Sequence, residues 1–225
     1  MKIFGSVLLI NYIKYYDLRI LFFIFLLSFV FSVNSSAQNL IGLNSGILNS
    51  NVHIDFGSDT NNYRLETQNK WGISASFFYQ EYFSKRFSLR FNLQFGNYGA
   101  IFSNKFTYNF YYLSFPMLIR YDIVQSSMYS LSFHSGWAHS LLSGGNIKSS
   151  FFTYNIKPGK DFLRYNLFFD VGIGIMFKLS QKTSFSTDIN LNRGLSDIYI
   201  KREPEQYPKM KNRAVSFTVG LARKI

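Results

Sequence analysis

Large apolar residues alternate with polar or small residues through the segment 87–96. Phe87, Leu89, Phe91, Leu93 and Phe95 occupy the odd positions, and the even positions are Ser88, Arg90, Asn92, Gln94 and Gly96. Successive side chains on a strand point to opposite faces, so this segment predicts a strand that is apolar on one face and polar on the other. A soluble sandwich would cover the apolar face with a second sheet, whereas a membrane barrel would expose it to lipid and keep the polar face inside a lumen.

The same alternation recurs along most of the chain. It is found in the segments 41–47, 71–80, 112–122, 131–141, 169–178, 185–194 and 215–222. Together with the segment 87–96 this predicts eight strands. Phe78, Leu118 and Met176 are apolar residues at otherwise polar positions of these strands.

The predicted connections alternate between short and long. The short ones are 84–86, 124–127 and 180–182, the long ones are 49–69, 143–163 and 200–212, and 99–105 is intermediate. Short turns at one end and long loops at the other are typical of outer-membrane barrels whose two chain ends lie at the periplasmic rim. We therefore expect an all-β fold, an eight-stranded antiparallel transmembrane up-and-down β-barrel. A soluble two-sheet sandwich is the alternative fold.

The first 37 residues have the features of a cleaved signal peptide. Lys2, Lys14 and Arg19 precede the apolar stretch 20–33, which is followed by small residues at Ser35 and Ala37. Fourteen apolar residues are fewer than the ~20 that a membrane-spanning helix needs. We expect residues 1–37 to be an export signal and residues 38–225 to form one barrel domain in the outer membrane of a Gram-negative bacterium.

Charge and cysteine content narrow the possible functions. Removing residues 1–37 takes away three of the 24 basic and one of the 12 acidic residues, which leaves a net charge of +10. The basic residues fall mainly in the predicted connections, where they either keep the loops soluble or contact the phosphates of lipopolysaccharide. In this setting we expect no nucleic-acid partner. The absence of cysteine excludes disulfides, thiolate metal sites and cysteine nucleophiles.

Four short motifs resemble those of a known family. IGLNSGI (41–47) looks like a glycine-punctuated first strand, and YLSFPMLIRY (112–121), VGIGIMF (171–177) and NRGLSDI (192–198) are similar to later strands. The mature chain resembles the small outer-membrane β-barrel domain family whose members are often described as PorT-like. Ser114 stands where that family usually has an acid, and the C-terminal Ile225 stands where a terminal aromatic is more common. The resemblance implies a barrel inserted by the barrel-assembly machinery, with some members linked to secretion or surface assembly.

Catalytic and cofactor signals are sparse. The sequence contains no phosphate-binding loop, zinc-binding helix or nucleophile elbow, and we expect no catalytic residue, cofactor or metal site. His134 and His139 are five residues apart and fall on opposite faces, which excludes a shared metal site on that strand. His134 and Ser132 both face the lumen, where they form either a pair that acts on lipid or, as we favour, ordinary lumenal contacts. Gly172 and Gly174 are expected to make room for bulky neighbours in the lumen.

Charged residues inside the predicted barrel form a structural hypothesis of their own. Arg90, Arg120 and Asp188 are expected at a similar depth, all facing inward. The interior of an eight-stranded barrel is just wide enough for side chains, so these charges should pair across the lumen and plug it. Unpaired charges would be costly there, so we expect Asp122 or Asp170 to join the network.

These patterns favour a non-enzymatic integral outer-membrane barrel with a plugged lumen. Its expected role is that of a structural, adhesion or surface-assembly and secretion component that acts through long extracellular loops. A lipid-modifying enzyme and a narrow pore or carrier are the alternative functions. The expected partners are outer-membrane lipid, lipopolysaccharide, the barrel-assembly machinery and an unidentified surface or periplasmic protein.

Overall fold

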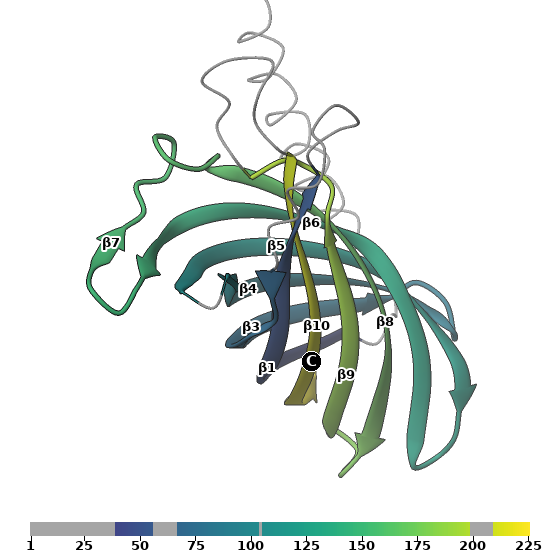
Figure 1. Ribbon diagram of the computed structural model, residues 1–225. Coiled ribbons are helices and arrows are strands. Elements are labelled where there is room, and N and C mark those ends of the chain that lie inside the picture. The colour runs from purple at the N-terminus through teal and green to yellow at the C-terminus, as the bar shows by residue number, and fades with distance from the viewer. Residues whose placement is uncertain (1–38, 56–66, 104, 199–208) are drawn as a thin grey trace, which may run out of the picture. The chain divides into compact units, whose positions relative to one another are not determined.

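The computed structural model describes residues 39–55, 67–103, 105–198 and 209–225, which form ten strands and no helix. Eight strands are long and two are short (Figure 1). The long strands are β1 (Asn39–Asp55), β3 (Lys70–Tyr82), β4 (Phe87–Phe102), β5 (Phe106–Gln125), β6 (Tyr129–Lys148), β8 (Tyr165–Lys178), β9 (Thr183–Gly194) and β10 (Lys209–Lys224). The short strands are β2 (Thr67–Gln68) and β7 (Thr153–Asn155). The eight predicted strands are therefore confirmed.

The long strands close into a single antiparallel barrel. Each pairs with the next long strand along the chain, and β1 pairs with β10 from Leu40–Lys224 to Asp55–Lys209. Closure leaves the ring without a free edge, so backbone donors and acceptors are paired between strands as a lipid environment requires. The up-and-down barrel is confirmed, and the alternative of two stacked sheets is wrong.

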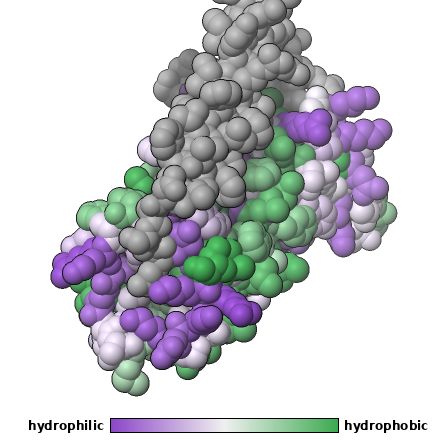
Figure 2. Space-filling view, turned by 180° about the vertical axis from the view of Figure 1, so that it is seen from behind, coloured by the Kyte–Doolittle hydropathy of each residue, from purple (hydrophilic) through white to green (hydrophobic). Residues whose placement is uncertain are grey.

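Apolar side chains cover the outside of the barrel. Leu43, Ile73, Ile173 and Leu221 are among many large apolar residues that are exposed on its outer face. On the side seen in Figure 2, hydrophobic residues gather between hydrophilic ones at both ends. Such a band matches the lipid-facing belt of an outer-membrane barrel.

The polar face of each strand points into the lumen, as predicted. The three apolar exceptions Phe78, Leu118 and Met176 are also buried there. No helix among the described residues is long and apolar enough to cross a membrane.

The short turns and the described chain ends lie at the same end of the barrel. The turns connect β3 to β4, β5 to β6 and β8 to β9. The amide of Ile225 donates a hydrogen bond to the carbonyl of Asn39 at 3.0 Å, which joins the end of β10 to the start of β1. This is the periplasmic end in barrels of this wiring. We call it the turn end, and the opposite end the loop end.

At the loop end the strands are longer than the alternation predicted. The intermediate connection expected at 99–105 is wrong, because β4 continues to Phe102 and β5 begins at Phe106. Gly99 and the polar residues that follow Phe102 suggested a loop, but Ala100 and Phe102 are buried and pair with β5, which extends the strand. The long connections expected at 49–69 and 143–163 begin later, after Asp55 and Lys148, and the one expected at 200–212 ends earlier, because β10 begins at Lys209. Their parts at 56–66 and 199–208 lie outside the described residues.

A proline interrupts the ladder between β4 and β5. The pairs Phe91–Met117 and Gln94–Ser114 flank a gap that contains Pro116. Proline has no amide hydrogen to donate, so a break at this position is expected. The barrel remains closed on both sides of the gap, and the buried Pro116 lines the cavity in the lumen.

Candidate functional site: a lumen filled in two layers

The first layer of the lumen is a charged cluster made by three strands. Asp188 on β9 receives Nη1 of Arg90 from β4 at 3.2 Å on one carboxylate oxygen and Nη1 of Arg120 from β5 at 3.0 Å on the other. All three side chains are buried. The alternation of each strand turns these residues inward, and the closed ring brings β9 opposite β4 and β5. The structure thus brings together three of the five residues expected in the network.

Neutral groups also contact the two guanidinium groups, although Nη2 of Arg90 and Nε of Arg120 are buried without a hydrogen-bond partner among the described residues. Nε of Arg90 donates to Oε1 of Gln80 at 2.9 Å, and its guanidinium carbon lies 4.2 Å from the centre of the Phe78 ring. Nη2 of Arg120 donates to Oγ of Ser132 at 2.5 Å. Phe78 broke the polar pattern of its strand because an aromatic face can stabilise a buried cation.

Two glycines make space for this layer. A Cβ atom on Gly174 would lie 2.0 Å from Oδ1 of Asp188 and 2.8 Å from Nη2 of Arg120. A Cβ atom on Gly172 would lie 2.6 Å from Nε2 of His134. The expectation that both glycines admit bulky lumenal neighbours is confirmed.

The other two predicted members, Asp122 and Asp170, lie apart from the arginines. Oδ2 of Asp122 accepts a hydrogen bond from Nε2 of Gln125 at 2.8 Å, and Oδ1 of Asp170 accepts one from Nδ2 of Asn192 at 2.7 Å. Neither carboxylate forms an ion pair within the described part of the chain. The expectation that one of them joins the network is not met, because both face inward but are satisfied by amides at other depths.

The histidines do not form a catalytic arrangement with Ser132. Nε2 of His134 lies 2.5 Å from Oδ1 of Asn190, and the hydroxyl of Ser132 donates to the carbonyl of Gly174 at 3.2 Å. His134 is buried in the lumen. Nδ1 of His139 lies 2.6 Å from the hydroxyl of Tyr165, on the opposite face of β6. Within the described residues, no group of histidines and acids could hold a metal ion.

Nearer the loop end, an aromatic layer fills the lumen. The rings of Tyr98, Tyr112 and Phe168 lie with their centres 5.5 to 5.8 Å apart. The hydroxyl of Tyr112 accepts a hydrogen bond from Nδ2 of Asn212 on β10 at 3.1 Å, across the barrel. Sequence reasoning missed this layer because it treated inward apolar residues as isolated exceptions and assigned residues 99–105 to a connection. The signal was present, since Tyr98, Ala100 and Phe102 continue the inward phase of Arg90.

Segments beyond the strands pack over the aromatic layer. The ring of Phe162 meets that of Phe110 edge-on at 5.0 Å, and Ile156 and Ile198 belong to the same buried cluster. The amide of Leu163 donates to the carbonyl of Ile198 at 2.9 Å, which ties the β7–β8 connection to the chain that follows β9. Apolar side chains of these segments therefore pack against the aromatic layer on its loop-end side.

The charged layer borders a small polar cavity. This cavity of about 30 Å³ is lined by inward-facing residues of several strands, including Arg90, His134, Asp170 and Asp188. One or two water molecules would fill such a volume. Among the described residues, side chains of the charged layer and of the aromatic layer therefore both occupy the lumen.

Comparison with solved structures supports this fold. The chain is similar to the crystal structure of Neisserial surface protein A at a TM-score of 0.51 and 10% identity, covering 82% of this chain and 97% of that one. It is similar to the outer membrane protein OprG from Pseudomonas aeruginosa at a TM-score of 0.54 and 10% identity, covering 84% and 96%. Likeness at this identity shows the fold and not an activity. No curated protein matches the sequence.

A family model covers most of the chain. Residues 34–199 match the model described as the outer membrane protein beta-barrel domain. With the closed barrel and its apolar belt, this match places the protein in the outer membrane of a Gram-negative bacterium. The chain belongs to the outer membrane protein beta-barrel domain family.

Proposed function

We propose that this protein is a non-enzymatic, non-conducting barrel that presents a binding surface at its loop end. The observation that carries this proposal is the presence of two layers of buried side chains inside the lumen, one charged and one aromatic. A barrel without a passage acts through the surfaces that it exposes. This interpretation supports an adhesion or surface-assembly role over a pore or carrier.

Extended strands supply a surface outside the membrane. β5 and β6 have 20 residues each, whereas a tilted strand crosses a bilayer with about 9 to 11. Their outer portions therefore project beyond the lipid. There β2 pairs with β4, and β7 pairs with β6 through Asn146–Asn155 to Lys148–Thr153, which widens the sheet (Figure 1).

This projecting sheet and the connection after it are basic and aromatic. Their exposed cations are Lys105, Lys148, Lys157, Lys160 and Arg164. Phe151 is 94% exposed, and Phe152 and Tyr154 are also exposed. Asp161 accepts hydrogen bonds from the hydroxyl of Tyr154 at 2.9 Å and from the amide of Lys157 at 2.8 Å, so its carboxylate serves the local fold. Cations beside exposed rings suit an acidic sugar polymer, such as a surface polysaccharide or the phosphorylated sugars of lipopolysaccharide.

Binding to a sulfated polysaccharide tests the surface. Purified barrel in lipid nanodiscs should bind immobilised dextran sulfate but not uncharged dextran, and the variant Lys148→Gln/Lys157→Gln/Lys160→Gln should bind it much more weakly. The control variant Lys85→Gln/Arg86→Gln/Lys178→Gln removes the same charge at the turn end and should bind normally. Equal loss in both variants would show attraction by net charge alone and would overturn the proposed surface.

Conductance tests the sealed lumen. The reconstituted barrel should give no steady current in planar bilayers, because on this proposal the charged layer and the aromatic layer block the lumen. Steady currents of porin size would overturn the proposal and favour the pore alternative.

A lipid-modifying enzyme is not supported by a specific contact. Ser132 and His134 hydrogen-bond to other partners, and both side chains are buried. Radiolabelled phospholipid vesicles give a direct test, since release of fatty acid that disappears in His134→Ala or His139→Ala would establish the enzyme. We expect no release with the wild-type protein.

Export and assembly follow from the same proposal. We propose that residues 1–37, which lie outside the described residues, are a cleaved signal peptide. We further propose that the barrel-assembly machinery inserts the 38–225 domain. The closer relation to PorT-like proteins remains a prediction, since the family match is to the broader barrel domain.

A further inference from the structure

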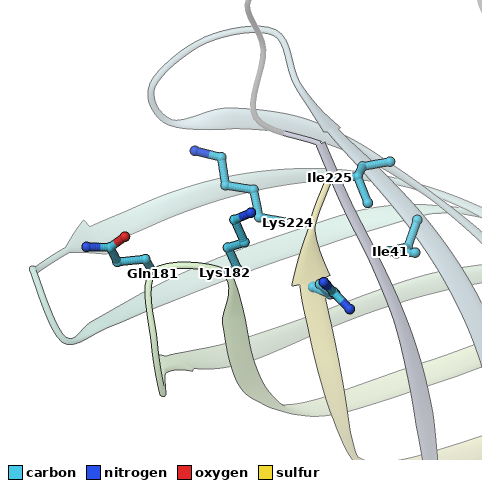
Figure 3. Close-up of a pocket in the computed structure, with 6 residues that line it drawn as sticks. Ile41, Gln181, Lys182, Lys224 and Ile225 are labelled. Carbon is cyan, nitrogen blue, oxygen red and sulfur yellow. The ribbon is translucent and has the colours of Figure 1, made fainter.

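A hollow of about 660 Å³ opens at the turn end of the barrel (Figure 3). It is lined by Ile41, Gln181, Lys182, Arg223, Lys224 and Ile225. Three of these six side chains are cations and none is an acid. The hollow lies far from the lumen layers and from the loop-end surface, so neither of the roles proposed above accounts for it.

Backbone pairing brings the three residues that carry the cations close together. The amide of Lys224 at the end of β10 donates to the carbonyl of Lys182 in the β8–β9 turn at 2.8 Å. Arg223 pairs with Ile41 on β1 and with Thr183 on β9. Figure 3 shows Lys182 on the β8–β9 turn, Lys224 at the end of β10 and Ile41 on the neighbouring strand β1. The site is therefore built where three strands meet.

The hollow lies at the border of the lipid-facing belt. Arg223 shares the outward phase of β10 with Leu221, which is exposed and pairs with Leu43 and Phe185. Arg223 is thus the next outward-facing residue after the apolar Leu221 on this strand. Basic side chains at this position lie at the level of lipid head groups.

Exposed apolar residues on the turns also indicate that the turn end lies at the level of the lipid head groups. Each of the three short turn regions carries one: Phe83 after β3, Met128 before β6 and Leu179 after β8. Large apolar side chains on otherwise polar turns are unfavourable in water but favourable at a membrane interface. The turn end therefore contacts the membrane surface around its rim.

The cations of the hollow lack an anionic partner. Lys182, Arg223 and Lys224 form no ion pair with any described residue. Even beside the C-terminal carboxylate of Ile225, three neighbouring cations give the hollow a net positive charge, which a bound anion would offset. Arginine can bind phosphate through two parallel hydrogen bonds, and lysine adds a point charge. Ile41 and Ile225 offer apolar contacts to the carbons that adjoin such a phosphate.

We propose that this hollow binds the head group of an anionic glycerophospholipid of the inner leaflet. The phosphate lies among Lys182, Arg223 and Lys224, and the acyl chains run along the apolar belt beside Ile41 and Leu43. Because short turns mark the periplasmic end of such barrels, the lipid belongs to the periplasmic leaflet and not to the lipopolysaccharide leaflet.

Native mass spectrometry of the barrel released from nanodiscs tests this site. With equal amounts of phosphatidylglycerol and phosphatidylethanolamine, the wild-type protein should retain phosphatidylglycerol preferentially. The variant Lys182→Gln/Arg223→Gln/Lys224→Gln should bind it on the order of a hundredfold more weakly, since each basic group near an anionic surface contributes about fivefold. Retention without preference between the two lipids would overturn the proposal.

Two controls make the result specific. The variant Lys85→Gln/Arg86→Gln/Lys178→Gln removes three cations from the same rim outside the hollow and should keep the preference; equal loss in this variant would overturn the site. Because substitutions in β10 can impair insertion, Lys182→Glu in the turn provides a second test. This variant should retain less phosphatidylglycerol, while heat-modifiable migration shows that its barrel has folded. Retention of lipid A at the same three cations, in place of phosphatidylglycerol, would overturn the assignment to the inner leaflet.

Discussion

Oδ1 of Asp188 lies 3.0 Å from Nη1 of Arg120, although the two residues are 68 positions apart in the chain. The other oxygen of the same carboxylate receives Arg90 at 3.2 Å. One carboxylate therefore pairs with cations from two strands on the far side of the barrel, and the three side chains together keep a net charge of about +1. This contact ties β9 to β4 and β5 across the lumen, in addition to the hydrogen-bonded ring.

The first prediction concerns the variant Asp188→Asn. It leaves two buried guanidinium groups without their counter-charge, so the free energy of unfolding should fall by about 3 to 5 kcal/mol. Urea unfolding of the barrel in phospholipid vesicles measures the change. Asp170→Asn is the matched control, since Asp170 is bound by Asn192 and not by an arginine, and it should cost about 1 kcal/mol. Equal losses would contradict the central role of Asp188.

The second prediction concerns Gly174→Ala. The added methyl group would lie 2.0 Å from Oδ1 of Asp188 and should displace the carboxylate, lowering the free energy of unfolding by about 1 to 3 kcal/mol. Gly144→Ala is the control, because a Cβ atom there meets nothing within 4 Å. The temperature at which the compact gel band disappears should drop for the first variant only. An unchanged temperature would mean that the charged layer adapts freely.

The third prediction concerns the aromatic layer. Tyr112→Phe removes the acceptor of Nδ2 of Asn212 and leaves that buried amide unsatisfied, so it should cost about 1 to 3 kcal/mol. Tyr111→Phe is the comparison, since its hydroxyl accepts only a 3.5 Å contact from Asn146, and it should change stability by less than about 0.5 kcal/mol. Urea unfolding again distinguishes them. A neutral Tyr112→Phe would show that the cross-lumen bond adds nothing.

The fourth prediction concerns the lipid-facing belt. Ile189 is exposed on the outer face of β9, where it pairs with Phe217 and Ile173. The variant Ile189→Arg should lower the free energy of unfolding in lipid by about 2 to 4 kcal/mol, because a cation in the hydrocarbon layer is unfavourable. Phe151→Arg, in the exposed connection at the loop end, should be nearly neutral. If both variants were neutral in vesicles, the proposed position of the belt would be wrong.

The sequence predicted the barrel because a two-residue period is local. Each strand from 41–47 to 215–222 shows which residues face lipid and which face the lumen, and the spacing of turns predicts antiparallel order. It also placed Arg90, Arg120 and Asp188 on the inner face. The ends of the strands were less certain, because residues 99–105 look like a loop until the pairing of Ala100 with Tyr108 and the burial of Phe102 are known.

Sequence alone therefore determined the face that each side chain occupies, since that depends only on alternation along a strand. The tertiary structure decided which inward residues meet, since that depends on register around the closed ring and on depth. Asp188 reaches both arginines, while Asp122 and Asp170, equally inward, are bound by Gln125 and Asn192. The aromatic layer and the cationic hollow at Arg223 likewise arise from strands far apart in the chain, whose contacts no local pattern records.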